Sequence, residues 1–388
     1  KSLPMKMFDQ AILENPYPSY EKWRAEQPVW WDAEASMWIV TRYEDVRGVL
    51  KDSATFSSKA MGEGEQRAIA LPLLSDDPPR HTELRSIVNR VFTSRALKEM
   101  EAEVEDLVES LLDEIKGESL VDISDAFTVP LPVRIISRLM GIPEERRDDF
   151  KRWSDALTGT AEATNIEQRM PDIMEMMGYF LSLIPERRSD PGEDLISKIT
   201  IATVEGEQLG DQDIAGFCML LLIAGNETTT NLLSNLLNYL ATDYQMWDTL
   251  RADPRKIDAA IEEILRYDSP VHFVSRKATK DVEISGTKVN AGDVVTVIMG
   301  AANRDGSHYE DADTFRLDRG KSDHHTFGHG IHFCIGAPLA RLEARYALQG
   351  LLKRYKKISH PLSADNERTH SFMLRGFHHL WLECQQIS

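Results

Sequence analysis

The sequence predicts a mainly α-helical fold with a smaller β portion, and three features support this prediction. Apolar residues recur every three to four positions through much of residues 97–157, as in helices that pack one face against a core. Residues 211–242 are longer and more apolar than a surface helix requires, which indicates a helix at the centre of the molecule. Residues 28–41, residues 271–299 and the C-terminal segment supply the β portion.

The N-terminal part is predicted to alternate between short helices and strands. Residues 18–26 favour a helix, and residues 28–41 favour a small β-hairpin around a polar turn. Helical spacing returns at residues 43–50. Residues 57–74 have little periodicity and are predicted to form a long loop, and a loop of this length is usually functional.

A further helix is predicted to begin near Pro78 and Pro79, because proline and acidic residues are common at the first turn of helices. His81 and Arg85 are four residues apart within it, so they share one face. There they could hold the carboxylates of one ligand. The alternative is an exposed polar pair with no ligand.

Residues 97–115, 125–140 and 144–157 are predicted to be packing helices, since charged faces separate their apolar positions. Residues 170–180 are rich in methionine, a side chain that fills irregular space. A position in the core is the favoured interpretation of that segment. A mobile lid over a substrate channel is the alternative.

The sequence Ala-Gly-Asn-Glu-Thr-Thr interrupts the long apolar helix at residues 224–229. Glycine and β-branched threonine both weaken a helix, so helix stability does not explain their presence here. We expect a local opening of the helix that leaves a carbonyl and a hydroxyl group free to hold water. The alternative is a threonine that hydrogen-bonds back to its own helix.

The chain beyond this helix contains a possible ion pair and then β structure. Glu263 and Arg266 lie one turn apart on a predicted helix, a weak signal in isolation because such pairs are common. After Pro270 the pattern favours strands, with a tight turn at residues 285–286 between two of them.

Composition limits the classes of partner and compartment. The net charge of −18 argues against nucleic acid and against anionic membrane surfaces, because both require basic patches. Three cysteines are too few for a disulfide framework and fit a reducing compartment. The N-terminal residues contain no long apolar run, so we expect a cytoplasmic protein without a membrane anchor.

Residues 327–336, with the sequence FGHGIHFCIG, are predicted to be a glycine-hinged loop that leads into a helix. Cys334 lies just before this helix, where free N–H groups favour the thiolate that binds metals. No second cysteine is near enough for a zinc or iron–sulfur site, and Cys-x-x-Cys-His is absent. A single axial thiolate to a non-covalently held haem remains.

The pattern Phe-Gly-x-Gly-x-His-x-Cys-x-Gly at residues 327–336 is similar to the cysteine-ligand loop of the cytochrome P450 family, the haem-thiolate monooxygenases. Residues 224–229 resemble the family's oxygen-binding motif, and Glu263 with Arg266 resembles its Glu-x-x-Arg motif. The resemblance implies a single prism-shaped domain over residues 1–388, with haem b between the long central helix and the cysteine loop.

The resemblance also implies roles for individual residues. Residues expected to bind the haem are His81, Arg85, Ala224, Gly225, Arg276, Phe327, Gly330, His332, Cys334 and Gly336, with Cys334 as the iron ligand. Thr228 would hydrogen-bond dioxygen, and Glu227 would relay protons from solvent. Residues expected to hold the fold behind the loop are Glu263, Arg266 and Arg319. Residues expected to contact substrate are Phe273, Val274, Ile223 and Met373.

The implied reaction inserts one oxygen atom of O2 into a C–H bond of a small apolar molecule, of the fatty acid, terpenoid or steroid class. Two alternatives are a hydrogen-peroxide-driven peroxygenase and a haem sensor or carrier without turnover. The presence of Glu227 and Thr228 disfavours both, since a proton relay serves O2 activation.

Electrons must come from a separate partner, because the chain has no flavin or nicotinamide fingerprint and no cysteine cluster. A ferredoxin or flavodoxin with its reductase is expected. Basic residues that could form one docking patch on the cysteine side are Arg80, Arg90, Arg95, Lys98, Arg341 and Arg345. The alternative is a scatter of solvated charges.

Overall fold

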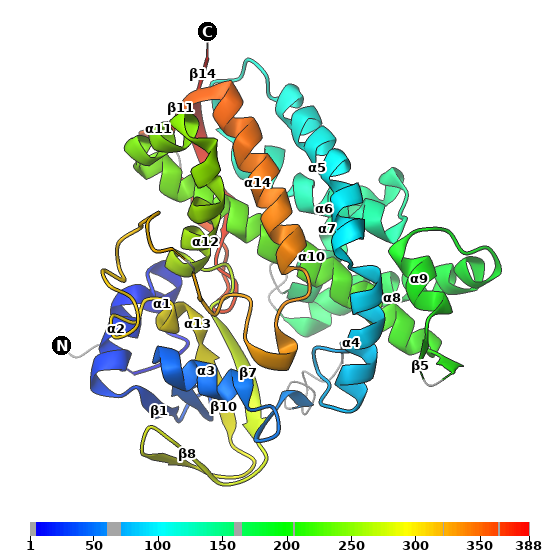
Figure 1. Ribbon diagram of the computed structural model, residues 1–388, viewed down its shortest axis with the longest axis vertical. Coiled ribbons are helices and arrows are strands. Elements are labelled where there is room, and N and C mark those ends of the chain that lie inside the picture. The colour runs from blue at the N-terminus through cyan, green and yellow to red at the C-terminus, as the bar shows by residue number, and fades with distance from the viewer. Residues whose placement is uncertain are drawn as a thin grey trace.

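The computed structural model describes residues 5–59, 71–158, 165–204, 206–320, 322–363 and 365–387. Helices form most of the molecule, and the largest sheet lies to one side of them with the N-terminal helices (Figure 1). The predicted mainly α-helical fold with a smaller β portion is therefore confirmed. None of the helices in the described ranges has both the length and the apolar composition needed to cross a membrane.

The helices follow one another along the chain with few long connections. Their bounds are α1 (Gln10–Glu14), α2 (Tyr17–Glu26), α3 (Tyr43–Lys51), α4 (Arg80–Val91), α5 (Ser94–Glu114), α6 (Pro130–Met140), α7 (Arg147–Thr158), α8 (Ile166–Ser189), α9 (Leu195–Ile201), α10 (Asp211–Thr242), α11 (Tyr244–Ala252), α12 (Ile257–Tyr267), α13 (Met299–Ala302) and α14 (Ala337–Arg354). The methionine-rich segment lies in α8, where Met176 is buried and Met174 is exposed.

The strands form one larger sheet and several small ones. Their bounds are β1 (Val29–Asp32), β2 (Met37–Val40), β3 (Phe56–Ser57), β4 (Leu120–Asp122), β5 (Thr203–Val204), β6 (Glu207–Gln208), β7 (Phe273–Ala278), β8 (Val282–Ile284), β9 (Thr287–Val289), β10 (Val294–Ile298), β11 (Tyr355–Ser359), β12 (Glu367–Arg368), β13 (Phe377–His379) and β14 (Trp381–Gln386). Much of the predicted loop at 57–74 falls on residues 60–70, outside the described residues, and its first residue ends β3.

The larger sheet has the strand order β1-β2-β10-β7-β3. The predicted N-terminal hairpin is present as β1 and β2, in which Trp30 pairs with Ile39. The second predicted hairpin is β8–β9, and its turn residues Ser285 and Gly286 both have positive φ, as a tight two-residue turn requires. Strand β7 therefore brings residues that follow α12 next to the N-terminal part of the chain.

Helix α10 passes through the middle of the helical part (Figure 1). It packs against α6, α8 and α14, and most of its side chains are buried, which explains its apolar composition. One core cluster joins α10 with α5, α12 and α14, and a second joins α10 with α6, α7 and α8. Because α10 is fixed on several sides, residues 224–229 in its middle have defined neighbours.

Candidate active site

A cavity of about 260 Å³ lies between α10, α4, strand β7, loop 327–336 and the start of α14. Its lining is mostly apolar, and the polar groups are few. Those polar or titratable lining residues are Arg85, Thr228, Thr229, Arg276, Thr326, His329, His332, Cys334 and Glu343. A large apolar cavity with a few convergent polar groups is the usual form of a small-molecule site.

Loop 327–336 presents Cys334 to this cavity. The Cys334 N–H donates to the Phe327 carbonyl at 2.8 Å, which closes the loop on itself. Gly330 has φ of 77°, and a Cβ atom there would lie 2.7 Å from the Leu50 carbonyl oxygen of α3. Only glycine fits this approach without strain, so Gly330 fixes the loop against α3 without lining the cavity.

The acidity of Cys334 depends on two opposing influences. Burial raises the pKa of its thiol, while backbone N–H groups of Gly336 and Ala337 and the charge of Arg85 lower it. The helix terminus therefore favours the thiolate, as expected from the sequence, but burial has the larger effect. A bound metal ion would displace the proton, because cysteine binds metals as the thiolate.

Two histidines from distant parts of the chain meet beside the loop. His81 on α4 is buried, and its ring centroid lies 4.2 Å from that of His332. The Nε2 atom of His81 has no hydrogen-bond partner among the described residues. Burial and the nearby Arg276 lower the pKa of His332 to about 3, so its imidazole is neutral. Both rings can donate an N–H to an acceptor placed between them.

Two arginines add positive charge at the same position. Arg85 lies on α4 and donates to the Phe333 carbonyl at 2.8 Å, while Arg276 on β7 donates to the Ser275 carbonyl at 2.9 Å. Neither guanidinium forms a salt bridge with a carboxylate of the described residues. Burial lowers the pKa of Arg276, and the charge of Asp77 offsets this only in part, so this cluster favours an added anion.

Helix α10 contributes the polar motif to the lining of the cavity. Ala224, Gly225, Thr228 and Thr229 line the cavity. The helix is continuous from residue 211 to 242, and the Thr228 hydroxyl donates to the Ala224 carbonyl at 2.9 Å. The expected opening of the helix is therefore wrong, and the threonine uses the alternative, a bond back to its own helix.

Glu227 is buried on α10 and does not line the cavity. Burial and the charge of Asp155 raise the pKa of its carboxyl group to about 7. Asp155 on α7 accepts two hydrogen bonds from Lys151, at 2.6 and 2.5 Å. The carboxyl group of Glu227 is therefore influenced by a charged pair on α7. It can be protonated or ionised near neutral pH.

The comparisons with known proteins agree on one family. The sequence model described as "Cytochrome P450" matches residues 163–376. "Cytochrome P450 109" from Bacillus spizizenii is 41% identical over 344 residues, which cover 87% of this chain and 84% of that protein. "Erythromycin C-12 hydroxylase" from Saccharopolyspora erythraea is 38% identical, covering 92% and 91%. The crystal structure of CYP109E1 from Bacillus megaterium with testosterone has a TM-score of 0.88 at 37% identity, covering 95% and 98%.

This chain belongs to the cytochrome P450 family. The family implies a haem-thiolate cofactor, and the relatives are named as monooxygenases and hydroxylases. Residues of this chain fit such a cofactor: Cys334 lines the cavity, and four cationic or N–H-donating groups form no salt bridge with a carboxylate of the described residues. No cluster of three histidine, cysteine or acidic residues in the described ranges could hold a metal ion, so an iron bound at Cys334 would need its other ligands from the cofactor.

The P450 Glu-x-x-Arg pair is completely buried. The Arg266 guanidinium lies 2.6 Å from Glu263, and it donates to carbonyls of Asn303, Ala312 and Thr314. Arg319 donates to the same Glu263 carboxylate at 2.8 Å. The three side chains therefore tie α12 to the segment that leads into loop 327–336, the position expected for them from the resemblance.

Of the four residues expected to contact substrate, Val274 lines the P450 cavity, and Ile223, Phe273 and Met373 do not. The Phe273 ring instead packs against Phe8, with centroids 6.4 Å apart. Sequence reasoning missed the apolar lining residues Leu73, Leu74, Val88, Phe92, Phe217, Leu220 and Leu221. Helical spacing back from Thr228 could have identified Leu221 and Phe217, which share its face of α10.

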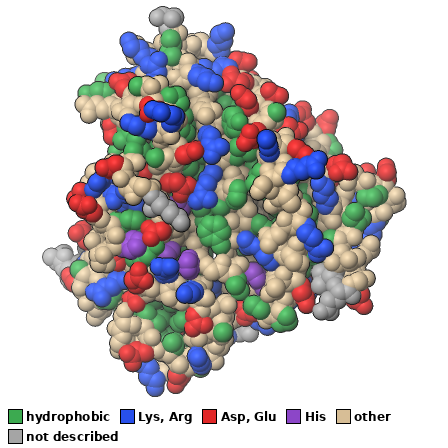
Figure 2. All heavy atoms as spheres, viewed as in Figure 1, with side chains coloured by type: hydrophobic (Ala, Val, Ile, Leu, Met, Phe, Trp, Pro, Cys, Tyr) green, Lys and Arg blue, Asp and Glu red, His purple; other side chains and the backbone are tan. Residues whose placement is uncertain are grey.

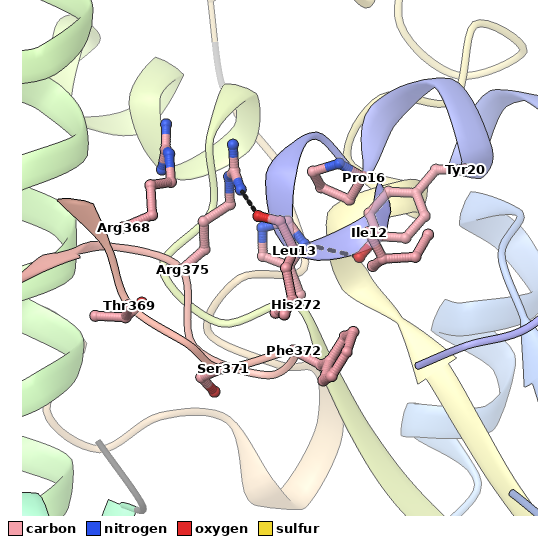
Figure 3. Close-up of a pocket in the computed structure, with 10 residues that line it drawn as sticks. All are labelled: Ile12, Leu13, Pro16, Tyr20, His272, Arg368, Thr369, Ser371, Phe372 and Arg375. Atoms are coloured by element: carbon pink, nitrogen blue, oxygen red, sulfur yellow. Dashed lines mark hydrogen bonds between the residues drawn. The ribbon is translucent and has the colours of Figure 1, made fainter. Parts of the chain in front are cut away.

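A second, much smaller cavity of about 10 Å³ is lined by Ser371 and Phe372, which directly precede Met373 in the chain (Figure 3). His272 lines this cavity, donates its backbone N–H to the Met373 carbonyl at 2.7 Å, and shares a hydrogen bond with Tyr20 at 2.9 Å. Burial lowers the pKa of His272 to about 3, so the ring is neutral. These contacts join the C-terminal loop to α2, and Met373 does not line the larger cavity.

The six basic residues considered for a docking patch are mostly paired with acids. Arg80 pairs with Asp213, Arg95 with Glu99, Arg341 with Glu262 and Arg345 with Asp258. On the face that carries α14 and the cysteine loop, basic and acidic side chains are interspersed around hydrophobic ones (Figure 2). The prediction of one six-residue basic patch is therefore wrong, because acidic neighbours neutralise four of its members.

Proposed function

We propose that this P450 inserts one oxygen atom of O2 into a C–H bond of a bulky apolar molecule, using electrons from a separate protein partner. The observation that carries the proposal is the cavity itself, in which Cys334, Thr228 and an apolar wall face the same space. The Glu227–Thr228 pair supports O2 rather than hydrogen peroxide as the oxidant, because only O2 requires protons from the protein.

The haem, when bound, supplies the iron centre at which O2 is reduced and cleaved. Cys334 would ligate it as a thiolate, and the electron-rich sulfur favours O–O cleavage. His81, Arg85, Arg276 and His332 would hold its two propionates, because they supply the positive charge and N–H donors that these carboxylates require.

Protons would reach the cavity through α10. Glu227 has a pKa of about 7, so it can accept a proton from the solvent side and give it up again near neutral pH. Thr228 lines the cavity next to it and holds its hydroxyl on the Ala224 carbonyl, leaving the oxygen lone pairs free to accept from water. The apolar wall excludes further water and orients the substrate.

The substrate class is inferred from the apolar lining of the cavity and from the relatives. The residues that line the cavity are mostly apolar and come from several helices and loops, so they suit an apolar ligand that contacts many side chains. CYP109E1 was crystallised with testosterone, and another relative is named as an erythromycin hydroxylase. Rigid polycyclic molecules such as steroids therefore suit this wall better than small polar ones.

A ferredoxin or flavodoxin with its reductase is the proposed electron donor. Arg90 and Lys98 are the two candidate cations without a salt bridge in the described structure. They lie on α4 and α5, and Arg85 of the same helix α4 donates to the Phe333 carbonyl of the cysteine loop. These two unpaired positive charges could steer an acidic partner toward the protein. The arginines that form salt bridges, Arg80, Arg95, Arg341 and Arg345, contribute little to the electrostatic attraction.

The test of the proposed reaction is a coupling measurement on Thr228→Ala. Wild-type protein with steroid, a ferredoxin and its reductase should convert consumed NADPH into hydroxylated product. The variant should bind the same steroid and consume NADPH, but release peroxide in place of most of the product, because water in the cavity loses its hydroxyl partner. Equal coupling in both proteins would contradict the role of Thr228.

A ligand panel tests the substrate class separately. Steroids, terpenes and fatty acids of similar apolar area should be compared by the spectral shift that each causes in the haem. We expect the steroids to give the tightest binding. Uniformly tighter binding of the linear fatty acids would contradict the inference from the shape of the cavity.

A further inference from the structure

Asp77 is an acid beside the cationic groups at the edge of the P450 cavity. It lies just before α4 and does not line the cavity. One oxygen of its carboxylate accepts the backbone N–H of Ser58 at 2.9 Å, and the other accepts the hydroxyl group of Ser57. Both donors are uncharged, so these bonds hold the carboxylate in place without neutralising its charge.

The two serines connect Asp77 to the sheet and to the cysteine loop. Ser57 ends β3, which pairs with β7, the strand that carries Arg276. Ser58 is 1% exposed, and its hydroxyl shares a hydrogen bond with Nε2 of His332 at 2.9 Å. Bonds within the chain therefore fix the carboxylate relative to the groups proposed to hold the haem propionates.

The charge of Asp77 acts on two of those groups. Burial lowers the pKa of Arg276, and Asp77 opposes this effect. Burial also has the largest effect on His81, whose pKa it lowers, and Asp77 again acts in the opposite direction. The Arg276 guanidinium donates to the Ser275 carbonyl and forms no salt bridge in the described structure, so Asp77 acts on it through space.

A propionate held by these groups would meet the same negative charge. Like charges near each other in a poorly hydrated setting repel strongly. The carboxylate keeps its position, because Ser57 and Ser58 hold it. Reduction of a bound haem adds one electron, so the same charge also disfavours the ferrous state relative to the ferric state.

We propose that Asp77 is a fixed negative charge that tunes the bound haem: it lowers the reduction potential of the iron held at Cys334 and speeds the loss of haem from the protein. Ser58 is a positioning residue, because it fixes both the carboxylate and the ring of His332. This role requires the propionates at the site proposed above, and it requires no oxygen insertion.

The first test measures the reduction potential of the substrate-free holoprotein by spectroelectrochemistry. Asp77→Asn removes the charge, but its amide can still accept from the Ser58 N–H and donate to Ser57. We expect the potential of Asp77→Asn to shift to more positive values. Asp77→Glu keeps the charge and should stay closer to wild type.

The control is Asp248→Asn, which removes an exposed charge from α11. Asp77 is partly buried, so its effect should persist at high salt, whereas any shift in Asp248→Asn should disappear as salt screens the surface. An unchanged potential in Asp77→Asn, or a shift equal to that of Asp248→Asn at high salt, overturns the proposal.

The second test measures the rate at which each holoprotein loses haem to an excess of apomyoglobin. Asp77→Asn should lose haem more slowly, by about threefold or more, because the propionates are no longer repelled. Ser58→Ala should lose haem faster, because His332 and Asp77 are no longer held in position. Structural damage would speed haem loss in both variants, so faster or unchanged loss in Asp77→Asn contradicts the role of its charge.

These measurements separate the role of Asp77 from the proposed function. If Asp77→Asn shifts the potential and slows haem loss, but wild-type protein forms no oxygenated product with any donor, the proposed reaction fails and the role of Asp77 stands. If wild-type protein hydroxylates a steroid, and Asp77→Asn keeps the wild-type potential and rate of haem loss, only the role of Asp77 fails.

Discussion

At the scale of single residues, two influences on the pKa of the Cys334 thiol oppose each other: burial raises it, and nearby N–H groups lower it. Its thiol is partly buried, which raises its pKa, yet two backbone N–H groups and Arg85 favour the thiolate. A bound metal ion would favour the thiolate form, because it binds the sulfur in place of the proton. The environment of Cys334 is thus suited to a thiolate that binds a metal ion and unsuited to a free reactive thiol.

Cys334→His tests this assignment. The reduced carbon-monoxide complex of wild-type protein should show the strongly red-shifted Soret band of thiolate ligation. The variant should lose this band even where it retains haem, because imidazole donates less electron density than thiolate. Cys384→Ser, at a buried cysteine far from the cavity lining, is the matched control and should keep the band. A red-shifted band in Cys334→His would exclude Cys334 as the ligand.

Glu227 gives a prediction about stability and pH. Its folded-state pKa of about 7 lies above the ordinary carboxyl value of 4.5, so between these values the folded state binds more protons than the unfolded state. Stability must then fall as pH rises through this window. In urea unfolding, Glu227→Gln should become more stable relative to wild type by up to about 3 kcal/mol between pH 5 and pH 8. A difference between the two proteins that does not change with pH would contradict the raised pKa.

At the scale of elements, α12 and the segment before the cysteine loop are joined by a buried ion pair. Arg266 is fully buried and makes hydrogen bonds with the Glu263 carboxylate and with three backbone carbonyls. Loss of one partner of a buried ion pair leaves the other charge unpaired. The pair therefore contributes to the position of the loop through the segment around residues 303–319.

Arg266→Met should reduce stability by about 3–5 kcal/mol and impair haem retention, because Glu263 would remain buried next to Arg319 alone. Arg345→Met is the matched control, since its salt bridge with Asp258 is on the surface and should contribute no more than about 1 kcal/mol. Unfolding curves and the haem-to-protein absorbance ratio measure both effects. Equal losses of stability and of bound haem in the two variants would contradict the structural role of the buried ion pair.

At the scale of the whole molecule, the strong negative charge contrasts with the face that carries the cysteine loop. The net charge is −18, but Arg90 on α4 and Lys98 on α5 lack acidic partners in the described structure. An acidic electron donor would be repelled by the net charge of the molecule and attracted locally by unpaired cations such as these two. Local rather than total charge would then decide where the partner docks.

The double variant Arg90→Glu with Lys98→Glu should slow reduction by a ferredoxin by about tenfold or more at low salt. The effect should shrink as salt screens the attraction. Lys280→Glu with Lys288→Glu, next to and within the β8–β9 hairpin, makes the same charge change away from the cysteine loop and serves as the control. Stopped-flow rates that fall equally in both double variants would mean that net charge, not docking, controls reduction.

The sequence determined the fold class and the reaction class. Loop 327–336 and residues 224–229 are short contiguous motifs in which several positions are fixed at once, so they could be read without coordinates. Helical periodicity located α5, α6, α7 and α10, and turn chemistry located the β8–β9 hairpin. These properties depend on residues close together in the chain, which is why one sequence was sufficient.

Only the tertiary structure decided which distant side chains share a space. It separates Phe273 and Met373 from the cavity that Val274 lines, because the C-terminal loop and α1–α2 cover one end of β7. It pairs Arg341 with Glu262, which no spacing in the sequence indicates. It also leaves the Glu343 carboxyl group without a hydrogen-bond partner among the described residues. This property depends on every neighbour of the side chain, so the sequence alone cannot show it.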